Sequence, residues 1–451
     1  MKKKAFLGID VSKGYADFVL LAEDKSILCE GFQLTDNPDG RARLKELIEI
    51  WLADEAEHFY CGVESTGGYE NNWYSYLKNL AESKPLSVAR LNPRGVKAVG
   101  AAILTRTVTD AVSAHNIALY LIGYPEKVSY QNAGTSDKCK EGRQQCTYLS
   151  MLKKTKVQFA NQFEKLLYQH FSEVMIYCRH GVPAWLLRML TRYPSARSVL
   201  KAGPSKLEQI KGISSGRALS LIKKVEGSVQ MVSSQIEHLI IMTAKEILHK
   251  KDLIENEKEY LYELYHDDDD VKLMSSIPGI GDQSAIELML EIEEVERFEF
   301  SKNISSYFGV HPQFKQSGDG TWSSHMSKQG RGQVRSILFM AALSGARCNP
   351  ILKKLYARFR AKGMHHYQAM GVVMHKLLRI IYGVLKHKQP FNVELDEKNQ
   401  QRSMEKQQEN EVKIKEVEKI RKQKKYRYQD LSTDAPISRQ NEKKRKKQMA
   451  S

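Results

Sequence analysis

The sequence predicts an α/β domain at the amino terminus and a mainly helical chain after it. Short apolar runs at residues 5–10, 17–22 and 27–32 have the length of strands, and turn-forming residues separate them. The elements expected next are a helix, a strand, a helix, a strand and a helix, at residues 41–52, 59–63, 69–80, 86–91 and 111–121. Three consecutive strands followed by alternating helices and strands is the order of an RNase H-like fold.

Spacing and end signals justify these elements. Within residues 41–52 the apolar side chains recur every three or four positions, which is the period of an amphipathic helix. Asp110 stands where the N-cap of the helix at 111–121 is expected. Turn residues at 123–135 indicate a loop that closes a first domain, residues 1–135.

The middle of the chain, residues 136–270, has a helical pattern. Residues 149–174 predict a long amphipathic helix. Further on, four apolar residues recur every seven positions, as in a short coiled coil, although an ordinary helix packed on one core face explains the same spacing. These residues are Ile240, Ile247, Ile254 and Leu261. The acidic run at 267–270 favours a solvated linker.

Residues 271–391 are expected to form a mainly α-helical carboxy-terminal domain. Its segment 277–281 (IPGIG) resembles a helix-hairpin-helix turn, in which glycines let the backbone turn tightly ahead of a helix. Gly279 and Gly281 are therefore candidates to approach a DNA phosphate backbone. A weaker match at 210–218 is explained equally well by an ordinary turn between helices.

The charge balance favours a polyanionic partner. The net charge is +17 over 451 residues. Residues 392–451 hold 17 basic and 11 acidic side chains and few apolar ones, so we expect a disordered or frayed tail that attracts nucleic acid nonspecifically. Six scattered cysteines without zinc-site spacing favour reduced thiols. The sequence shows neither a secretory signal nor a membrane span, and we expect a soluble, cytoplasmic protein.

Three acidic residues are placed by this strand order. Asp10 ends the first strand, Glu64 ends the fourth, and Asp110 opens the helix after the fifth. Because the ends of the first and fourth strands are adjacent in an RNase H-like sheet, the fold brings the carboxylates together. Hard divalent ions such as Mg²⁺ bind carboxylate oxygens and keep positions open for phosphate and water. The placement predicts a site for Mg²⁺ (or Mn²⁺).

A polar, glycine-rich stretch at 309–332 contains a candidate nucleophile. Ser317 lies among basic side chains, where a hydroxyl could attack a phosphodiester while cations stabilise the developing charge. The basic residues expected to bind nucleic acid are Lys315, Lys328, Arg331 and Arg335. An ordinary surface turn explains the same composition.

Several motifs together resemble one family. Those of the first domain are similar to the amino-terminal DEDD, RuvC-like domain of insertion sequence 110 family transposases. They are 8–13 (GIDVSK), 63–70 (VESTGGYE) and 109–118 (TDAVSAHNIA). Later motifs resemble the carboxy-terminal transposase domain of that family. They are 277–281 (IPGIG), 317–318 (SG), 327–330 (SKQG) and 377–382 (LLRIIY). The match runs in order, with similar spacing, from about residue 6 to residue 391.

The resemblance implies a recombinase that excises and inserts its own element, guided by a noncoding bridge RNA whose loops pair with donor and target DNA. In that family the carboxylates coordinate Mg²⁺ beside a serine that forms a phosphoserine intermediate, and a homo-oligomer, dimer to tetramer, is expected. Carried over, the metal ligands are Asp10, Glu64 and Asp110, and the nucleophile is Ser317. Two alternatives stay open: a RuvC-like metal-dependent nuclease of the junction-resolving type, and an inactive nucleic-acid-binding relative.

One departure from the family pattern affects the metal site. The family has a second Asp three residues after the third acid, and this chain has Ser113 there. A hydroxyl holds a metal only weakly or through water, and His115 points to another face of the helix. Three alternatives stay open: the site tolerates three carboxylates, the metal affinity is reduced, or the enzyme is inactive.

Overall fold

The computed structural model describes residues 3–54, 56–65, 67–104, 109–130, 137–228, 231–317 and 320–395, together with 398 and 402. The chain divides into two compact units, residues 1–135 and 136–451. Most of the tail that the sequence predicts as disordered lies outside the described residues.

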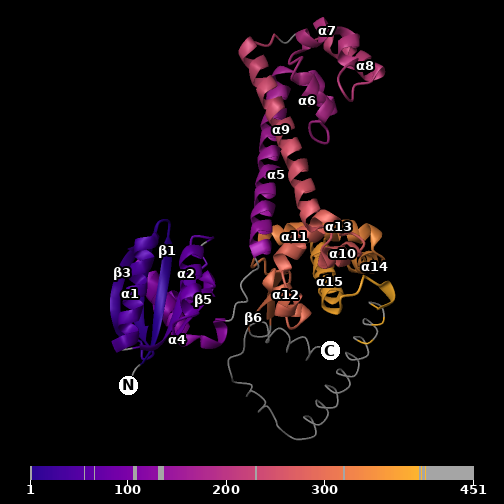
Figure 1. The fold of residues 1–451 in the computed structure, drawn as a ribbon. Helices are drawn as coiled ribbons and strands as arrows, with labels where there is room; N and C mark the ends of the chain where they lie inside the picture. The colour runs from indigo at the N-terminus through magenta and orange to yellow at the C-terminus, as the bar shows by residue number, and fades with distance from the viewer. Residues whose placement is uncertain are drawn as a thin grey trace, which may run out of the picture. The chain divides into compact units, whose positions relative to one another are not determined.

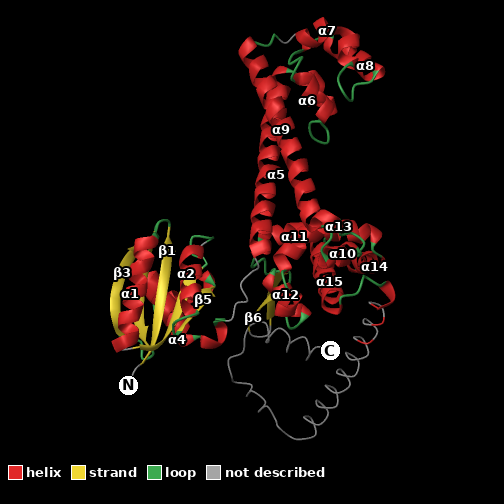
Figure 2. Ribbon diagram, viewed as in Figure 1, coloured by secondary structure: helices red, strands yellow, loops and turns green. Residues whose placement is uncertain are grey.

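The first unit is built on one five-stranded sheet (Figures 1 and 2). Its strands are β1 (Lys3–Ser12), β2 (Tyr15–Ala22), β3 (Ile27–Thr35), β4 (Ala56–Glu64) and β5 (Leu86–Leu91). The strand order is β3-β2-β1-β4-β5, with β2 antiparallel to its two neighbours and β1, β4 and β5 parallel. This is the RNase H-like order that the sequence predicts.

Helices cover the two faces of this sheet. Apolar residues of α1 (Pro38–Asp54) and α2 (Asn71–Ala81) pack on the face to which Leu7 and Ile9 of β1 belong. The other face packs against α4 (Asp110–Gly123), and α3 (Pro93–Ala102) contributes Val96 to the same cluster. A short 3-10 helix, η1 (Pro125–Lys127), follows α4.

Two details of the helices differ from the sequence prediction. The N-cap of α4 is Thr109, whose hydroxyl accepts a hydrogen bond from the Val112 amide at 3.3 Å, and Asp110 is the first helical residue. The prediction of Asp110 as the cap was wrong because Thr109 has the extended backbone that a cap requires. The sequence analysis also missed α3, although Asn92 caps it and Pro93 opens it.

The contact between α4 and β1 depends on Gly8. A Cβ atom at this position would lie 2.0 Å from the carbonyl oxygen of Ala114 and 2.7 Å from the amide nitrogen of Ala118. Real atoms do not approach that closely, so only glycine lets the helix backbone rest on the strand. Gly8 therefore sets the distance between the sheet and the amino-terminal turn of α4.

The second unit contains a pair of long helices, α5 (Asp137–His170) and α9 (Ser234–Tyr265), which lie side by side (Figure 1). The chain between them forms a group of short helices. These are η2 (Ser172–Tyr177), α6 (Ala184–Leu190), α7 (Ala196–Glu208) and α8 (Ser215–Val225). We call residues 171–228 the tip. Helix α5 begins twelve residues before the start that the apolar pattern predicts.

The elements after α9 form what we call the base. They are α10 (Asp269–Ser275), α11 (Asp282–Ile292), η3 (Val295–Arg297), α12 (Ser301–Tyr307), β6 (Pro312–Ser317), β7 (Gly320–Met326), α13 (Gly332–Cys348), α14 (Pro350–Ala361) and α15 (His366–His387). Strands β6 and β7 pair as an antiparallel hairpin. Residues of α15 contribute much of the buried apolar surface of the base.

Two separate cores stabilise the second unit. Ile240 and Ile247 of α9 belong to the core of the tip, whereas Ile254 and Leu261 belong to the core of the base. All four heptad residues are buried. The four heptad residues thus connect the two cores, because all of them lie on the single helix α9.

The acidic run at 267–270 is not a free linker. The Asp268 carboxylate accepts a hydrogen bond from the Asp270 amide at 3.0 Å and caps α10, and Asp270 pairs with Lys388 at 2.7 Å. The prediction of a solvated linker was wrong because negative charge is stabilised at the amino terminus of a helix.

No helix in the described part of the chain is long and apolar enough to cross a bilayer. The six cysteines all lie among the described residues, and they are free thiols, as the sequence predicts.

We expect Gly8→Ala to lower the free energy of unfolding by about 1–3 kcal/mol, because the added methyl group overpacks the contact with α4. Denaturant unfolding of the full chain measures this change. Gly123→Ala is the matched control, since Gly123 ends the same helix and a Cβ there meets no atom within 4 Å. Equal losses in the two variants would show that α4 does not depend on the close approach at Gly8.

Candidate active site

Asp10 and Glu64 lie level with each other on the sheet face that packs against α4. Ile9 pairs with Val63 in the parallel register, so the next residues, Asp10 and Glu64, stand side by side where β1 and β4 approach their ends. Side chains alternate along a strand, and Asp10 follows Phe6 and Gly8 on the α4 face. The sheet thus delivers two of the three predicted acids to one place.

The third predicted acid reaches the same place from α4. Asp110 is the first residue of the helix, and its carboxylate accepts a hydrogen bond from the Tyr15 hydroxyl at 3.2 Å. Tyr15 is the first residue of β2, so this bond connects the start of α4 to the strand that pairs with β1. The structure therefore brings together the three acids that the sequence predicts.

The neighbouring carboxylates affect the pKa of Asp10. Burial, followed by the negative charges of Glu64 and Asp110, raises its pKa from an ordinary 3.8 to about 6. Burial also raises the pKa of Glu64, and Lys97 opposes that rise. A divalent cation at this place would relieve the repulsion that the charges of Glu64 and Asp110 exert on Asp10.

Ser113 faces this cluster. Its hydroxyl donates a hydrogen bond to the Asp10 carboxylate, which partly lowers the pKa of Asp10. Position 113 is three residues after Asp110, about one helical turn, so both side chains point toward the strand ends. Burial lowers the pKa of His115, which favours a neutral imidazole.

The sequence analysis missed a fourth carboxylate, Asp17. Asp17 lies directly opposite Asp10 in the antiparallel pair of β1 and β2, on the same face of the sheet. Gln33 of β3 donates a hydrogen bond to its Oδ2 atom at 3.3 Å. Burial raises the pKa of Asp17, and the charge of Asp110 raises it further.

A signal for Asp17 was available in the sequence. Ser12 pairs with Tyr15 across a two-residue turn, in which Gly14 has a left-handed backbone (φ 93°). A two-residue turn fixes the register, and counting outward from it places residue 10 opposite residue 17. The hairpin register, rather than any motif, identifies this acid.

The donor chemistry of the cluster suits Mg²⁺ or Mn²⁺. Asp10, Asp17, Glu64 and Asp110 offer hard carboxylate oxygens, and Ser113 offers a hydroxyl. Among the described residues no group of three or more His, Cys, Asp or Glu side chains is arranged tightly enough to hold an ion as it stands. The cluster fits the ion by its charge and donor type.

Ser317 is the last residue of β6, paired with Gly320 at the turn of the hairpin. Its side chain, like that of Lys315, lies outside the described residues, as do residues 318 and 319 entirely. The sequence analysis expected a polar turn here, and it missed both strands of the hairpin. The role of Ser317 as nucleophile and that of Lys315 in binding stay predictions.

The other predicted basic residues have different surroundings. Lys328 is exposed. Arg331 donates to both carboxylate oxygens of the buried Glu291, at 2.8 and 2.9 Å. The guanidinium of Arg335 donates to the carbonyl oxygens of Phe308, Gln329 and Gly330. These contacts of Arg331 and Arg335 hold the loop that follows the hairpin.

The two glycines of the helix-hairpin-helix-like turn also have different surroundings. Gly279 has a left-handed backbone (φ 108°), and a Cβ there would lie 2.5 Å from the Cα atom of Gly345 in α13. Its packing alone requires glycine. Gly281 is exposed, precedes α11 as its N-cap, and has open space around it. Their contact with DNA stays a prediction.

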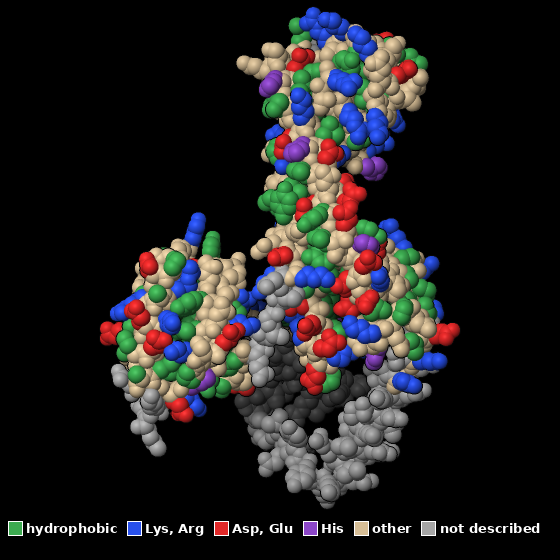
Figure 3. Space-filling model, viewed as in Figure 1, with side chains coloured by type: hydrophobic (Ala, Val, Ile, Leu, Met, Phe, Trp, Pro, Cys, Tyr) green, Lys and Arg blue, Asp and Glu red, His purple; other side chains and the backbone are tan. Residues whose placement is uncertain are grey.

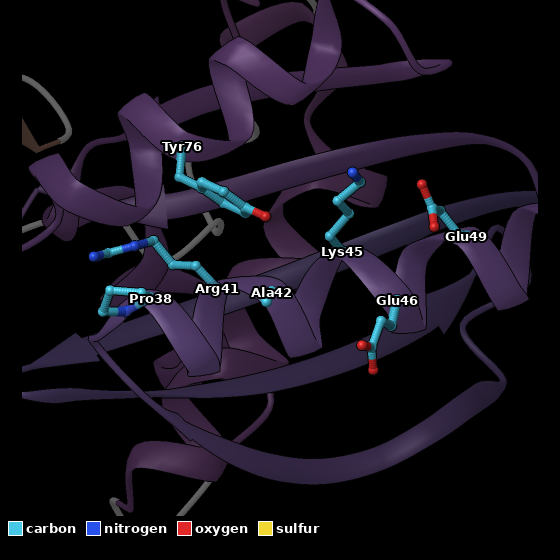
Figure 4. A pocket seen from close by; sticks show the side chains of 7 residues that line it. All are labelled: Pro38, Arg41, Ala42, Lys45, Glu46, Glu49 and Tyr76. Carbon is cyan, nitrogen blue, oxygen red and sulfur yellow. The ribbon is translucent and has the colours of Figure 1, made fainter.

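The first unit also has an open pocket of about 550 Å³ that is remote from the carboxylates (Figure 4). It lies between α1 and α2, which pack on the opposite face of the sheet. Its lining residues are Pro38, Arg41, Ala42, Lys45, Glu46, Glu49 and Tyr76. The pocket is not part of the acidic site.

Known proteins resemble this chain over most of its length. A family model described as a transposase matches residues 7–172, and one described as the transposase IS116/IS110/IS902 family matches residues 271–357. The pilin gene-inverting protein of Moraxella bovis is 30% identical over 402 residues, which cover 87% of this chain and 99% of that protein. An uncharacterized 43.6 kDa protein of insertion element IS110 from Streptomyces coelicolor is 25% identical over 114 residues, 25% of this chain and 28% of that protein.

Among solved structures, RuvC of Thermus thermophilus covers 28% of this chain and 98% of its own, with 14% identity and a TM-score of 0.23. The fold assignment rests on the strand order and does not use this distant likeness. The fold and the acidic cluster are those of a DNA-processing enzyme. The relatives place the chain in the IS110 family of transposases, and it is a DNA transposase or recombinase.

We expect Asp10→Asn to raise the melting temperature of the metal-free protein at pH 7.5. The folded state raises the pKa of Asp10, so the ionised carboxylate destabilises it above about pH 6. The gain should shrink as the pH falls through 6 toward 3.8, because Asp10 then becomes neutral in the folded native chain. Thermal melting in EDTA across this range measures it.

Glu57→Gln is the control for this prediction. Glu57 is an exposed acid on β4, the strand that carries Glu64. It should not reproduce the pH-dependent gain. A melting temperature of Asp10→Asn that follows the native chain at every pH would contradict the crowding of the carboxylates.

Proposed function

We propose that this transposase exchanges DNA strands through a covalent phosphoserine intermediate, with Ser317 as the nucleophile and Mg²⁺ or Mn²⁺ held by the carboxylate cluster. The observation that supports it is the convergence of Asp10, Glu64 and Asp110 on one sheet face, with the raised pKa of Asp10. A divalent ion bound there would supply Lewis-acid stabilisation of the phosphate charge.

The proposed reaction balances in two transfers. The Ser317 oxygen forms a bond to a DNA phosphorus, the bond from that phosphorus to one DNA oxygen breaks, and the serine proton leaves to a base or to solvent. The freed DNA end carries a hydroxyl group. A hydroxyl of another DNA end then attacks the phosphoserine, which joins the two DNA ends and releases the serine.

We propose Asp17 as the fourth carboxylate of the site, in place of the acid that position 113 lacks. Its side chain shares the sheet face of Asp10, and the bond from Gln33 orients its carboxylate. Ser113 would then serve as a hydrogen-bond donor to Asp10. A chain without an acid at 113 would keep four carboxylates at the metal.

We also propose that a noncoding bridge RNA guides the reaction and that the enzyme works as a homo-oligomer, dimer to tetramer. The support for both is membership in the family and its resemblance in motif order. The net charge of +17 agrees with nucleic acid as the partner.

We expect Ser317→Ala to abolish strand exchange and the covalent protein–DNA adduct, with affinity for DNA nearly unchanged, since the hydroxyl contributes little to binding. A denaturing gel of the full chain with labelled DNA and Mg²⁺ detects the adduct. Ser336→Ala is the control, because Ser336 is an exposed serine of α13 in the same unit. An adduct that persists in Ser317→Ala, or DNA hydrolysis without any adduct, would favour the metal-dependent nuclease.

We expect Asp17→Asn to raise the Mg²⁺ concentration that gives half of the maximal thermal stabilisation by about tenfold, because a neutral amide replaces a negatively charged carboxylate. Adding Ser113→Asp to this variant should restore much of the affinity, since position 113 faces Asp10. Ser113→Asp alone should melt earlier without metal, through added like charge, and recover with it.

Glu57→Gln again controls for a general loss of negative charge. If the native chain responds to Mg²⁺ and Asp17→Asn responds identically, Asp17 is not a ligand. If the native chain itself shows no response to Mg²⁺ or Mn²⁺, the metal site as a whole is wrong.

A further inference from the structure

The tip, residues 171–228, is strongly basic. It contains ten Lys and Arg residues against three acids, Glu173, Glu208 and Glu226. The ten are Arg179, Arg188, Arg192, Arg197, Lys201, Lys206, Lys211, Arg217, Lys223 and Lys224. In the space-filling view Lys and Arg gather over α6, α7 and α8 (Figure 3). This net charge of +7 lies in 58 residues, a density several times that of the whole chain.

These cations are not matched by acids. Among the described residues, no ion pair joins any of the ten to Asp or Glu. Arg188 and Arg217 donate hydrogen bonds to the carbonyl oxygens of Lys211 and Gly212. Some cations of the base do pair with acids, as the pairs of Arg331 with Glu291 and Lys388 with Asp270 show.

The basic surface is carried on a rigid support. The tip has its own apolar core, in which Leu186, Val199 and Leu221 of α6, α7 and α8 are buried. Aromatic rings fix two of its cations, because Arg217 lies 5.0 Å from the ring of Trp185 and Lys224 lies 4.7 Å from that of Tyr177. Both rings are partly buried against the core of the tip, so they hold the two cations at its surface.

The weaker helix-hairpin-helix-like motif, 210–218, lies within this surface. Gly212 turns the chain between α7 and α8 with a left-handed backbone (φ 98°) and packs against Trp185. The turn sets Lys211 and Arg217 on either side of it, both exposed. The sequence alone left this motif undecided, and its basic surroundings favour a contact with phosphate.

We propose that the tip is a nucleic-acid-binding site that contacts the phosphodiester backbone, separate from Ser317 and the carboxylates. The matched family segments are residues 7–172 and 271–357, so they cover only the first two residues of the tip. The proposal rests on the proposed function only in that the chain works on nucleic acid. It requires neither the metal nor the serine intermediate.

Salt dependence of binding tests the proposal, because each phosphate contact contributes about 0.9 to the slope of log Kd against log salt for duplex DNA. The variant is Lys201→Gln, Lys206→Gln and Lys223→Gln in the full chain, all exposed. The control is Lys45→Gln, Lys78→Gln and Lys127→Gln, which removes the same charge from exposed sites of the first unit. The probes are a DNA duplex and an RNA hairpin, each titrated in EDTA.

We expect the tip variant to lose about 2.7 in the slope with the DNA duplex and the control to lose none. A loss with the DNA duplex alone assigns the surface to DNA, a loss with the RNA hairpin alone assigns it to RNA, and both losses assign it to their shared backbone. Equal slopes in the tip variant and the native chain, or equal losses in the tip and control variants, would overturn the proposal.

Two further measurements keep the outcomes distinct. If the triple variant melts early, the single Lys206→Gln takes its place, with an expected loss of about 0.9 in the slope. The adduct assay of the native chain with Mg²⁺ tests the serine mechanism independently. A missing adduct with an intact slope difference would reject the mechanism and keep the tip site.

Discussion

The close approach of α4 to β1 at Gly8 is the constraint on which the acidic site depends. Asp110 and Ser113 lie in the first turn of α4, just ahead of Ala114, whose carbonyl oxygen rests on Gly8. A helix farther from the sheet would hold both side chains farther from Asp10. In the GIDVSK motif, Gly8 is thus required for packing against α4, and Asp10 contributes charge to the acidic site.

That geometry makes the site costly for the metal-free protein. Asp10 is half-buried beside other carboxylates, and burial, followed by the charges of Glu64 and Asp110, raises its pKa to about 6. Tyr15, Gln33 and Ser113 each donate a hydrogen bond to one of the acids, which offsets part of this cost. Folding energy from the rest of the sheet keeps the charges together.

The sequence was sufficient for the parts of the fold that local patterns specify. Strand order and the three acids follow from apolar runs and end signals, and the departure at position 113 follows from the resemblance to the family. Asp17 required the register of a hairpin, and the N-cap at Thr109 required the backbone angle at one residue. The roles of Gly279 and Arg335 depend on Gly345 and on three carbonyl groups, partners that are distant in the sequence and that no local pattern discloses.

Net charge could not locate the basic surface either, because the partners of each basic residue are distant in the sequence. Arg331 and Arg335 stand in a motif that looks suited to phosphate, yet their guanidinium groups hold a carboxylate and backbone carbonyls. A cation already paired with a buried acid must give up that partner before it can bind phosphate. Among the described residues, the ten cations of the tip have no acid to give up. Which basic residues are available to nucleic acid is therefore decided by the tertiary partners of each one, and the +17 of the chain leaves that distribution open.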